Sequence, residues 1–416
     1  MNFRQTPFAN AVLVTASLLL LMQSGCTQNA PQERGAIYSA NEEGLSISII
    51  DPEIGKVQTT SVEVTPHNVQ ISDDGLTLLA VGSLPSKESE DMEMNMKTKG
   101  RLLAFDAANV SRGVVSNIEV GIMPAHVIFG AGAKQAFVTN SGDNTLSVID
   151  LSKREIIKTI SVGLSPHGLR MSPDGKVIYV ANTADGTVSV ISVTKLSELA
   201  RIPVGKGPVQ IAFTPDGKRS YVTLRDENSA AVIDTLSQRV IAKIRVGSGP
   251  IQVFASPNGR EVYVANQGVK AAPGETLSVI DTASQKVVAE IVTGAGAHGV
   301  AVSRNGNRVF VANSFANTVS VIDPVSRKVL RNVAVGRGPG GITFADGNLF
   351  SAPDFLQCHP ASARVTRVRQ RQVLPTRPFP PRRSDCVIAR IVHDRFPVLL
   401  RAVAINRGRS IRVREQ

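Results

Sequence analysis

Hydrophobic and polar residues alternate in short runs along most of this chain. Three such runs are GLRMS (168–172), VIYVAN (177–182) and TVSVI (187–191), and the last two are rich in β-branched residues. A period of two predicts β-strands, and no convincing helical period occurs among the repeated runs. Asp174-Gly175 separates the first two runs, and this dipeptide is typical of a two-residue hairpin turn with positive φ angles. We therefore predict a domain made almost entirely of short strands.

The set of strands recurs seven times, at a spacing close to 42 residues. Four short strands per unit at this period are typical of a blade of a β-propeller. One blade cannot bury its own faces, so the copies are expected to stack around an axis. By this alignment, the copies open at His67, His126, His167, Val209, Ile251, His298 and Gly340. The predicted fold is all-β, a seven-bladed propeller with four-stranded blades.

The two ends of the repeat region each supply part of a blade. Residues 36–64 contain a second, third and fourth strand, and residues 340–344 supply a first strand. We expect these segments to form one shared blade, because such a blade hides both strand edges and closes the ring. In the alternative, a strand at Phe350 competes with Ile37–Ala40 for that place. The predicted propeller spans residues 36–350.

The second strand of most copies ends in a characteristic tetrad. It stands as FVTN at 137–140, YVAN at 179–182 and 263–266, FVAN at 310–313, and departs to YVTL at 221–224. This motif resembles that of the bacterial YVTN-type (YncE-like) β-propeller repeat proteins, over about residues 35–345. The same repeats are similar to surface-layer propellers and, more remotely, to lactonase and haem d1 propellers. The resemblance therefore implies a fold and leaves the activity open.

The N-terminus resembles an export signal. An apolar run, Ala11–Met22, is too short to span a bilayer comfortably and is typical of a signal-peptide core. It leads into QSGC (23–26), which resembles a lipoprotein cleavage box, although Gln23 stands where Leu is usual. We predict a lipoprotein-type signal peptide over residues 1–25, with an ordinary secretory signal as the alternative.

Cys26 is the predicted site of lipidation, and residues 26–35 form the predicted tether. Thr27 rather than Asp follows this cysteine, and by resemblance this implies sorting to the outer membrane if the host is Gram-negative. We therefore expect a cell-envelope lipoprotein that faces the periplasm and is held at the membrane through Cys26. The alternative is secretion into the periplasm.

The last part of the chain, residues 351–416, has a different composition. From Asp354 onward it contains 14 arginines, no lysine and four acidic residues, so most of the net charge of +12 lies there. Three interpretations are open: disorder, a misread coding frame, or a basic arm for anionic polymers. Nucleic acid is not an expected partner, because export and the lack of interleaved aromatic residues both disfavour it.

Four of the six histidines occupy the opening position of a copy: His67, His126, His167 and His298. This position is expected to lie between the fourth strand of one blade and the first strand of the next. The loops that follow the second strands should share this face, around the mouth of the central channel. Residues predicted near the same mouth are Asn140, Asn182, Asn266, Asn313 and, in the fourth copy, Arg225.

Three interpretations compete for this ring. Neutral imidazoles are good ligands, so His67, His126 and His167 form a candidate metal or haem site. Alternatively, imidazole and amide donors would form a polar funnel for an anionic or hydroxylated ligand. In the third interpretation, each histidine caps a turn of the repeat and has no ligand.

A lengthened loop in the first copy carries Met92, Met94 and Met96 at alternate positions. It follows a second strand, so we expect it on the histidine-bearing face. Thioethers at this spacing are suited to Cu(I), which is a soft ion. A plain polar loop is the alternative. No cofactor is assigned from the sequence, and copper or another divalent metal is the candidate.

Catalysis finds little support, because the chain has no Gly-x-Ser-x-Gly elbow, no phosphate loop and no zinc-protease helix. We predict a binding module that engages a ligand, or a protein or polymer partner in the cell envelope, through its histidine-bearing face. The second candidate is a metal- or haem-linked periplasmic protein, related to copper or haem d1 proteins. The third is a lactonase-like hydrolase, for which Asp226 or Glu227 would be the acidic residue.

Overall fold

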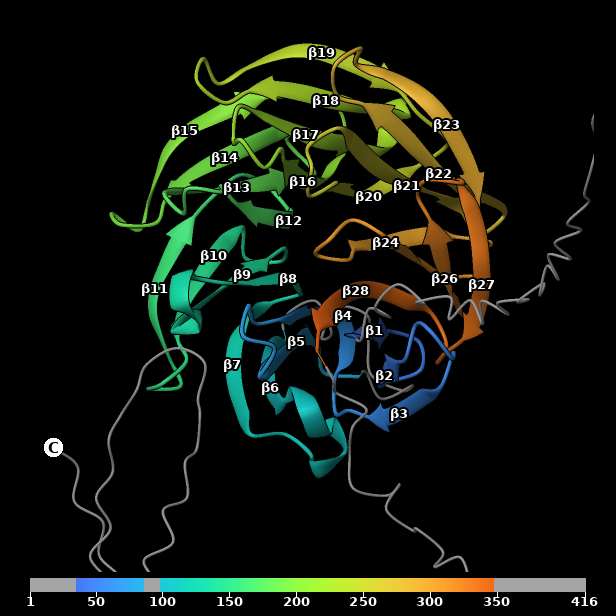
Figure 1. Ribbon diagram of the computed structural model, residues 1–416. Helices are drawn as coiled ribbons and strands as arrows, with labels where there is room; N and C mark the ends of the chain where they lie inside the picture. The colour runs from blue at the N-terminus through green and yellow to red at the C-terminus, as the bar shows by residue number, and fades with distance from the viewer. Residues whose placement is uncertain (1–34, 86–97, 348–416) are drawn as a thin grey trace, which may run out of the picture. The chain divides into compact units, whose positions relative to one another are not determined.

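The computed structural model describes residues 35–85 and 98–347. Seven four-stranded antiparallel sheets stand as blades around one axis, with the first strand of each blade innermost (Figure 1). The predicted all-β, seven-bladed propeller is therefore confirmed. No helix of the described residues is long and apolar enough to cross a membrane.

The blades are numbered here along the chain, each written from the axis outward. Blade 1 comprises β4 (Thr65–Ile71), β5 (Thr77–Ser83), β6 (Lys99–Asp106) and β7 (Ser116–Ile122). Blade 2 comprises β8 (Pro124–Phe129), β9 (Gln135–Asn140), β10 (Thr145–Asp150) and β11 (Glu155–Ser161). Blade 3 comprises β12 (Pro166–Met171), β13 (Val177–Asn182), β14 (Thr187–Ser192) and β15 (Ser197–Pro203). Blade 4 comprises β16 (Pro208–Phe213), β17 (Arg219–Leu224), β18 (Ser229–Asp234) and β19 (Arg239–Arg245).

Blade 5 comprises β20 (Pro250–Ala255), β21 (Glu261–Val269), β22 (Ala272–Asp281) and β23 (Lys286–Val292). Blade 6 comprises β24 (Ala297–Val302), β25 (Val309–Asn313), β26 (Thr318–Asp323) and β27 (Lys328–Ala334). The closing blade comprises β28 (Pro339–Asp346), β1 (Gly35–Asn41), β2 (Ser46–Ile50) and β3 (Val57–Ser61). Three short 3₁₀ segments are η1 (Ala107–Arg112), η2 (Ala131–Ala133) and η3 (Arg225–Glu227).

The closing blade joins the two ends of the repeat region, as predicted. Strand β28 pairs antiparallel with β1, and Ile37 lies opposite Phe344 in the register. The N-terminal segment therefore takes the place of the second strand. Phe350, the centre of the alternative strand, lies outside the described residues.

The hydrophobic core is divided among the spaces between neighbouring blades. The three inner strands are almost fully buried, whereas the outer strand alternates exposed and covered residues, as in β19. Aromatic side chains cross these spaces: Tyr179 of blade 3 contacts Phe213 of blade 4, with ring centroids 4.8 Å apart. Each blade thus buries its faces only by packing on its neighbours.

The predicted two-residue hairpin turns are wrong in detail. Gly175 has a φ of 70°, but Asp174 does not adopt a positive φ. The N–H of Gly175 donates to the carbonyl of Ser172, and the Asp174 carboxylate accepts from the Ser172 hydroxyl and the Lys176 N–H. The turn is therefore longer, and only its glycine needs the left-handed conformation. The aspartate braces the turn through its side chain.

Several predicted features lie outside the described residues. These are the signal peptide (1–25), Cys26 and nearly all of the tether (26–35), the loop methionines Met92, Met94 and Met96, and the arginine-rich tail (351–416). They stay predictions.

Candidate functional site

The innermost strands align on a residue that lies opposite the end of the second strand of the same blade. In blade 3 this residue is Pro166, opposite Asn182, and in blade 2 it is Pro124, opposite Asn140. The next position along the chain is occupied, from blade 1 to the closing blade, by His67, Ala125, His167, Val209, Ile251, His298 and Gly340. The candidate residues thus lie within the innermost strands and not between blades, which corrects the predicted placement.

His126 does not occupy the same position as the other three histidines, which is a second correction. It lies one residue further along, where blades 4 and 5 carry Gln210 and Gln252. The hydrogen bonds agree: the Thr139 hydroxyl accepts from the His126 N–H, as the Thr223 hydroxyl accepts from the Gln210 N–H. Successive residues of a strand point to opposite sides. The side chain of His126 therefore leaves its strand in another direction than the side chains of His67, His167 and His298 leave theirs.

Three imidazoles nevertheless converge in the interior. The ring centroids lie 5.6 Å apart for His67 and His126, 5.1 Å for His67 and His167, and 4.9 Å for His126 and His167. One nitrogen from each ring lies within 4.8 Å of the other two. We call these three residues the histidine cluster. His298 is buried and makes no ring contact with the cluster within the described parts of the chain.

Glu42 is the carboxylate of this site. It directly follows β1, and its Oε1 lies 3.3 Å from Nδ1 of His67. The equivalent residues in blades 2 and 3 are Ser141 and Thr183, whose hydroxyls donate to carbonyls of the next blade. Glu42 was not predicted from the sequence. The available signal was an acidic residue at a position where blades 2 and 3 carry a hydroxyl.

Glu42 and His67 shift each other's pKa. Burial alone raises the pKa of Glu42, but the charge and hydrogen bond of His67, with His298 and His167 adding to them, lower it to about 2. Burial lowers the pKa of His67, yet the Glu42 carboxylate outweighs it, so the pKa lies above its ordinary value. Glu42 is therefore ionised, and it fixes a proton on Nδ1 of His67.

His126, His167 and His298 are neutral at pH 7. Burial, followed by the nearby His67 and His298, lowers the pKa of His167 to about 3. Burial is also the main reason that the pKa of His298 is lowered to about 4, and that of His126 lies well below its ordinary range. Neutral imidazoles carry a free lone pair, which is the form that binds a metal.

A single proton can occupy the space between His67 and His167. Their Nε2 atoms lie 3.1 Å apart, and one must donate to the other. A tetrahedral ion with metal–nitrogen bonds of about 2.0–2.1 Å holds its nitrogens about 3.3 Å apart. A metal ion that replaced this proton would therefore need little movement of the two rings.

His126 needs a larger adjustment. Oε1 of Gln210 accepts from the N–H of Ile211, so its Nε2 donates to Nδ1 of His126. This places the proton of the neutral ring on Nε2. Ligation through Nε2 requires the Gln210 amide to rotate, so that its oxygen accepts from Nδ1–H.

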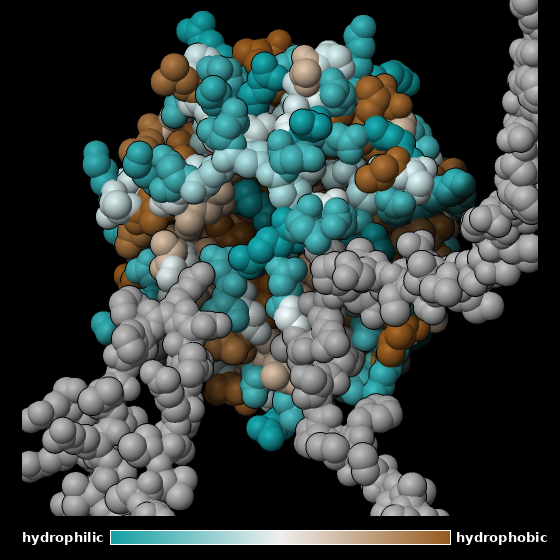
Figure 2. Space-filling model, viewed as in Figure 1, coloured by the Kyte–Doolittle hydropathy of each residue, from teal (hydrophilic) through white to brown (hydrophobic). Residues whose placement is uncertain are grey.

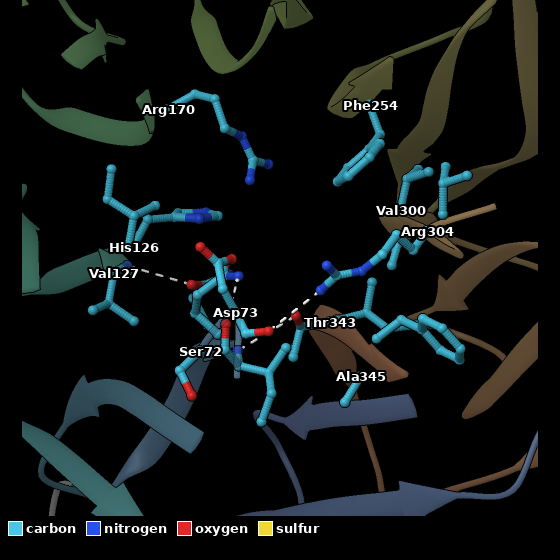
Figure 3. A pocket seen from close by; sticks show the side chains of 18 of the residues that line it. Ser72, Asp73, His126, Val127, Arg170, Phe254, Val300, Arg304, Thr343 and Ala345 are labelled. Atoms are coloured by element: carbon cyan, nitrogen blue, oxygen red, sulfur yellow. Dashed lines mark hydrogen bonds between the residues drawn. The ribbon is translucent and has the colours of Figure 1, made fainter. Parts of the chain in front are cut away.

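The histidine cluster lies between two cavities. The loop-side cavity, of about 550 Å³, includes Glu42, His67, His167 and Arg225 in its lining. The turn-side cavity, of about 480 Å³, includes His126 and Gln210 (Figure 3). In the space-filling view, hydrophilic residues surround a hollow at the centre of the ring (Figure 2). The cluster is thus reached from either side of the propeller axis.

The predicted asparagines are placed differently from the histidines. Asn140 is fully buried, and its Nδ2 donates to the hydroxyls of Thr145 and Ser147 in the next strand. Asn182, Asn266 and Asn313 form the same pair of bonds in their own blades. This geometry favours a role in holding the strands together over contact with a ligand.

The candidate hydrolase residues are also engaged elsewhere. Asp226 forms an ion pair with Arg225, with 2.9 Å between Oδ1 and Nε. Glu227 pairs with Lys243 and accepts from the N–H of Lys206. Of this group, Arg225 alone lines the loop-side cavity, where it lies on the same side as His67 and His167.

Comparison with solved structures shows the same fold in proteins from several other sources. A hydrazine synthase chain from Kuenenia stuttgartiensis has 23% identity and a TM-score of 0.57, covering 69% of this chain and 93% of that one. A protein of unknown function from Desulfotomaculum acetoxidans has 16% identity and a TM-score of 0.62, covering 75% and 99%. A Bacteroides fragilis chain titled as a candidate 6-phosphogluconolactonase has 16% identity and a TM-score of 0.60, covering 76% and 99%. At these identities the likeness concerns the fold alone.

No curated protein matches this chain. The family model for the YNCE-like beta-propeller matches residues 79–261 and 254–348, which is well over half of the chain. The matched region spans most of the strands that form the ring, and it agrees with the tetrads read from the sequence. The chain belongs to the YNCE-like β-propeller family.

Proposed function

We propose that this protein is a metal-binding propeller of the cell envelope, which holds one transition-metal ion on His67, His126 and His167. The observation that carries the proposal is the convergence of three imidazole nitrogens within 4.8 Å of one another. It supports a ligand site at the propeller axis and favours a metal among the predicted ligands.

The donor set selects the kind of metal. Imidazole suits zinc, copper, iron and nickel, and a site of three histidines leaves one coordination position open. Access from the loop-side cavity would let water or a small ligand reach that position. Divalent copper should bind more tightly than zinc, because affinity at nitrogen sites rises towards copper along the first row.

Metal titration tests this proposal. Full-length protein freed of metal with a chelator should bind one Cu(II) or Zn(II), measured by calorimetry. His167→Ala should weaken binding by at least about a hundredfold, because one of three ligands is lost. His298→Ala is the matched control, since this buried histidine lies outside the cluster, and it should bind as the unchanged protein does. Absent binding, or equal loss in both variants, would contradict the proposal.

Glu42→Gln should lower the metal affinity by about tenfold to a hundredfold, the usual effect of losing an outer carboxylate that orients a ligand. The amide keeps the size of the side chain but no longer holds the proton on Nδ1 of His67 by charge. The affinity of the unchanged protein should fall as the pH drops below the raised pKa of His67, and this slope should move to lower pH in the variant. An unchanged pH profile would show that Glu42 does not position His67.

We further propose that a lipid on Cys26 anchors the propeller at the outer membrane, facing the periplasm, where a protein or polymer partner meets it. The QSGC box supports the anchor. Radioactive palmitate should label the full-length protein in bacteria, and Cys26→Ala should abolish labelling and release the protein from the membrane fraction. Labelling that persists in the variant would rule out Cys26.

A further inference from the structure

Seven residues, one from each blade, occupy the same position in the innermost strands, and Arg170 is the charged one among them. It lies four residues after the proline at which β12 begins. The residues at this position, from blade 1 to the closing blade, are Gln70, Ile128, Arg170, Ala212, Phe254, Ala301 and Thr343. All except Ala212 line the turn-side cavity. A single cation thus interrupts a ring of uncharged side chains.

Arg170 has no counter-ion among the described residues. Its guanidinium carbon lies 5.4 Å from the ring centroid of Phe254, which is a cation–π contact. Both side chains point into the cavity (Figure 3). Burial lowers the pKa of Arg170 to about 10, so the group stays cationic at neutral pH. A cation that is half-buried without a partner is costly unless an anion or water compensates it.

A second donor faces the same cavity without an acceptor. Gln252 is 5% exposed, and its Nε2 has no hydrogen-bond partner within the described residues. The neighbouring Gln210 differs, because its amide is already bonded to His126 and to the backbone of Ile211. Arg170 and Gln252 are therefore two donors of this cavity that are free to receive a ligand.

The acidic groups of the cavity do not neutralise Arg170. Asp346 pairs with Arg304, with 2.7 Å between Oδ2 and Nε. Asp73 and Asp74 are exposed residues of the turn, and Asp74 is bonded to Ser72 and to the N–H of Leu76. Burial lowers the pKa of Arg170, and no carboxylate of the described residues forms an ion pair with it.

We propose that the turn-side cavity binds a small oxyanion, a carboxylate or phosphate group of a small polar molecule, on Arg170 and Gln252. A guanidinium matches such groups through two parallel hydrogen bonds. The volume of about 480 Å³ suits a small molecule, and Phe254 offers an apolar wall for its uncharged part. Arg170 and Gln252 are not among the proposed metal ligands, but His126 lines the same cavity, so the site is tested on protein free of metal.

Calorimetric titration with inorganic phosphate and with citrate, at constant ionic strength, tests this site. The full-length protein is first freed of metal with a chelator and then dialysed into chloride buffer without it. Binding of either anion is expected, and the tighter of the two identifies the class of oxyanion. Arg170→Gln should weaken that binding by at least about tenfold, because the bidentate cation is lost. Arg304→Gln is the matched control, since Arg304 lines the same cavity but is paired with Asp346, and its effect should be under about threefold.

A second readout separates a binding role from a structural one. In chloride buffer without phosphate or citrate, Arg170→Gln should raise the midpoint of thermal unfolding, because it removes an unpaired cation. Addition of the bound anion should then raise the midpoint of the unchanged protein and leave the variant unaffected. No binding of either anion at 10 mM, or equal weakening in both variants, would overturn the proposal without bearing on the metal site.

Discussion

Acidification from pH 6.5 to pH 5 is expected to lower the free energy of unfolding of the propeller by several kcal/mol. His126, His167 and His298 have lowered pKa values, so the folded state stays unprotonated while the unfolded chain gains protons. Each such group costs roughly 1.4 kcal/mol per pH unit, or roughly 2 kcal/mol over this range. Stability is therefore highest above pH 6.5 and falls with acid.

Two groups modify this loss without reversing it. The raised pKa of His67 contributes stability below about pH 6.5, and this contribution disappears as the pH rises through its folded-state pKa. The pKa of Glu42, about 2, lies below its ordinary value, so its contribution is present above about pH 4.5 and is lost only below that. Within the range from pH 6.5 to pH 5, His67 alone offsets part of the cost.

Denaturant unfolding at pH 7, 6 and 5 measures the effect. His298→Gln is the informative variant, because it removes one depressed histidine and leaves the histidine cluster in place. Between pH 6.5 and pH 5, the free energy of unfolding of the variant should fall by roughly 2 kcal/mol less than that of the unchanged protein. An equal slope in the variant and the unchanged protein would show that His298 titrates normally in the folded state.

Removal of β28 should abolish cooperative folding of the whole propeller. A chain that ends at Arg337 loses the innermost strand of the closing blade, and β1 is left with an unpaired edge. It also loses the stacking of Phe344 on Phe310, whose ring centroids lie 5.0 Å apart. Blades of a propeller are stable only against their neighbours, and an open edge promotes aggregation.

The matched control is a chain that ends at Gly347, which keeps every described strand. It should unfold in one cooperative transition at the midpoint of the full-length protein, as followed by circular dichroism. The shorter chain should show no such transition and should aggregate. A cooperative transition in the shorter chain would mean that closure by β28 is not needed for stability.

The fold could be predicted because its signal is repeated. Each copy gives the same strand pattern. The N-terminal segment lacks a first strand and the last copy supplies a single first strand, so the two together make one complete blade that closes the ring. The turns were misassigned, since Asp-Gly is also typical of a longer turn in which only Gly175 has a positive φ. A dipeptide does not distinguish these turn types.

The candidate site could be predicted only in part. Histidines near the axis are evident from their repeat position, but aligning the copies on histidine placed His126 one residue out of register. Alignment on the proline, as for Pro124 and Pro166, would have corrected this error. The contact between His67 and His167 spans 100 residues of sequence, so it depends on the curvature of the ring, which no local pattern specifies.

Other roles could not be assigned from the sequence for chemical reasons. An asparagine at the end of a strand can donate its amide either to a ligand or to hydroxyls of the next strand. Asn140 donates to hydroxyls of the next strand. Arg170 was read as one polar residue of an alternating strand, because its significance appears only when all seven blades are compared at one level. Single-residue exceptions to a repeat are thus the best guide to sites on this fold.

X-ray absorption at the metal edge of full-length protein loaded with one equivalent of Cu(II) or Zn(II) tests the central claim most directly. Three imidazole nitrogens at about 2.0–2.1 Å should surround the ion, with their number falling by one in His126→Ala. A first shell of oxygen alone, or the same imidazole count in both proteins, would contradict a metal site at the histidine cluster.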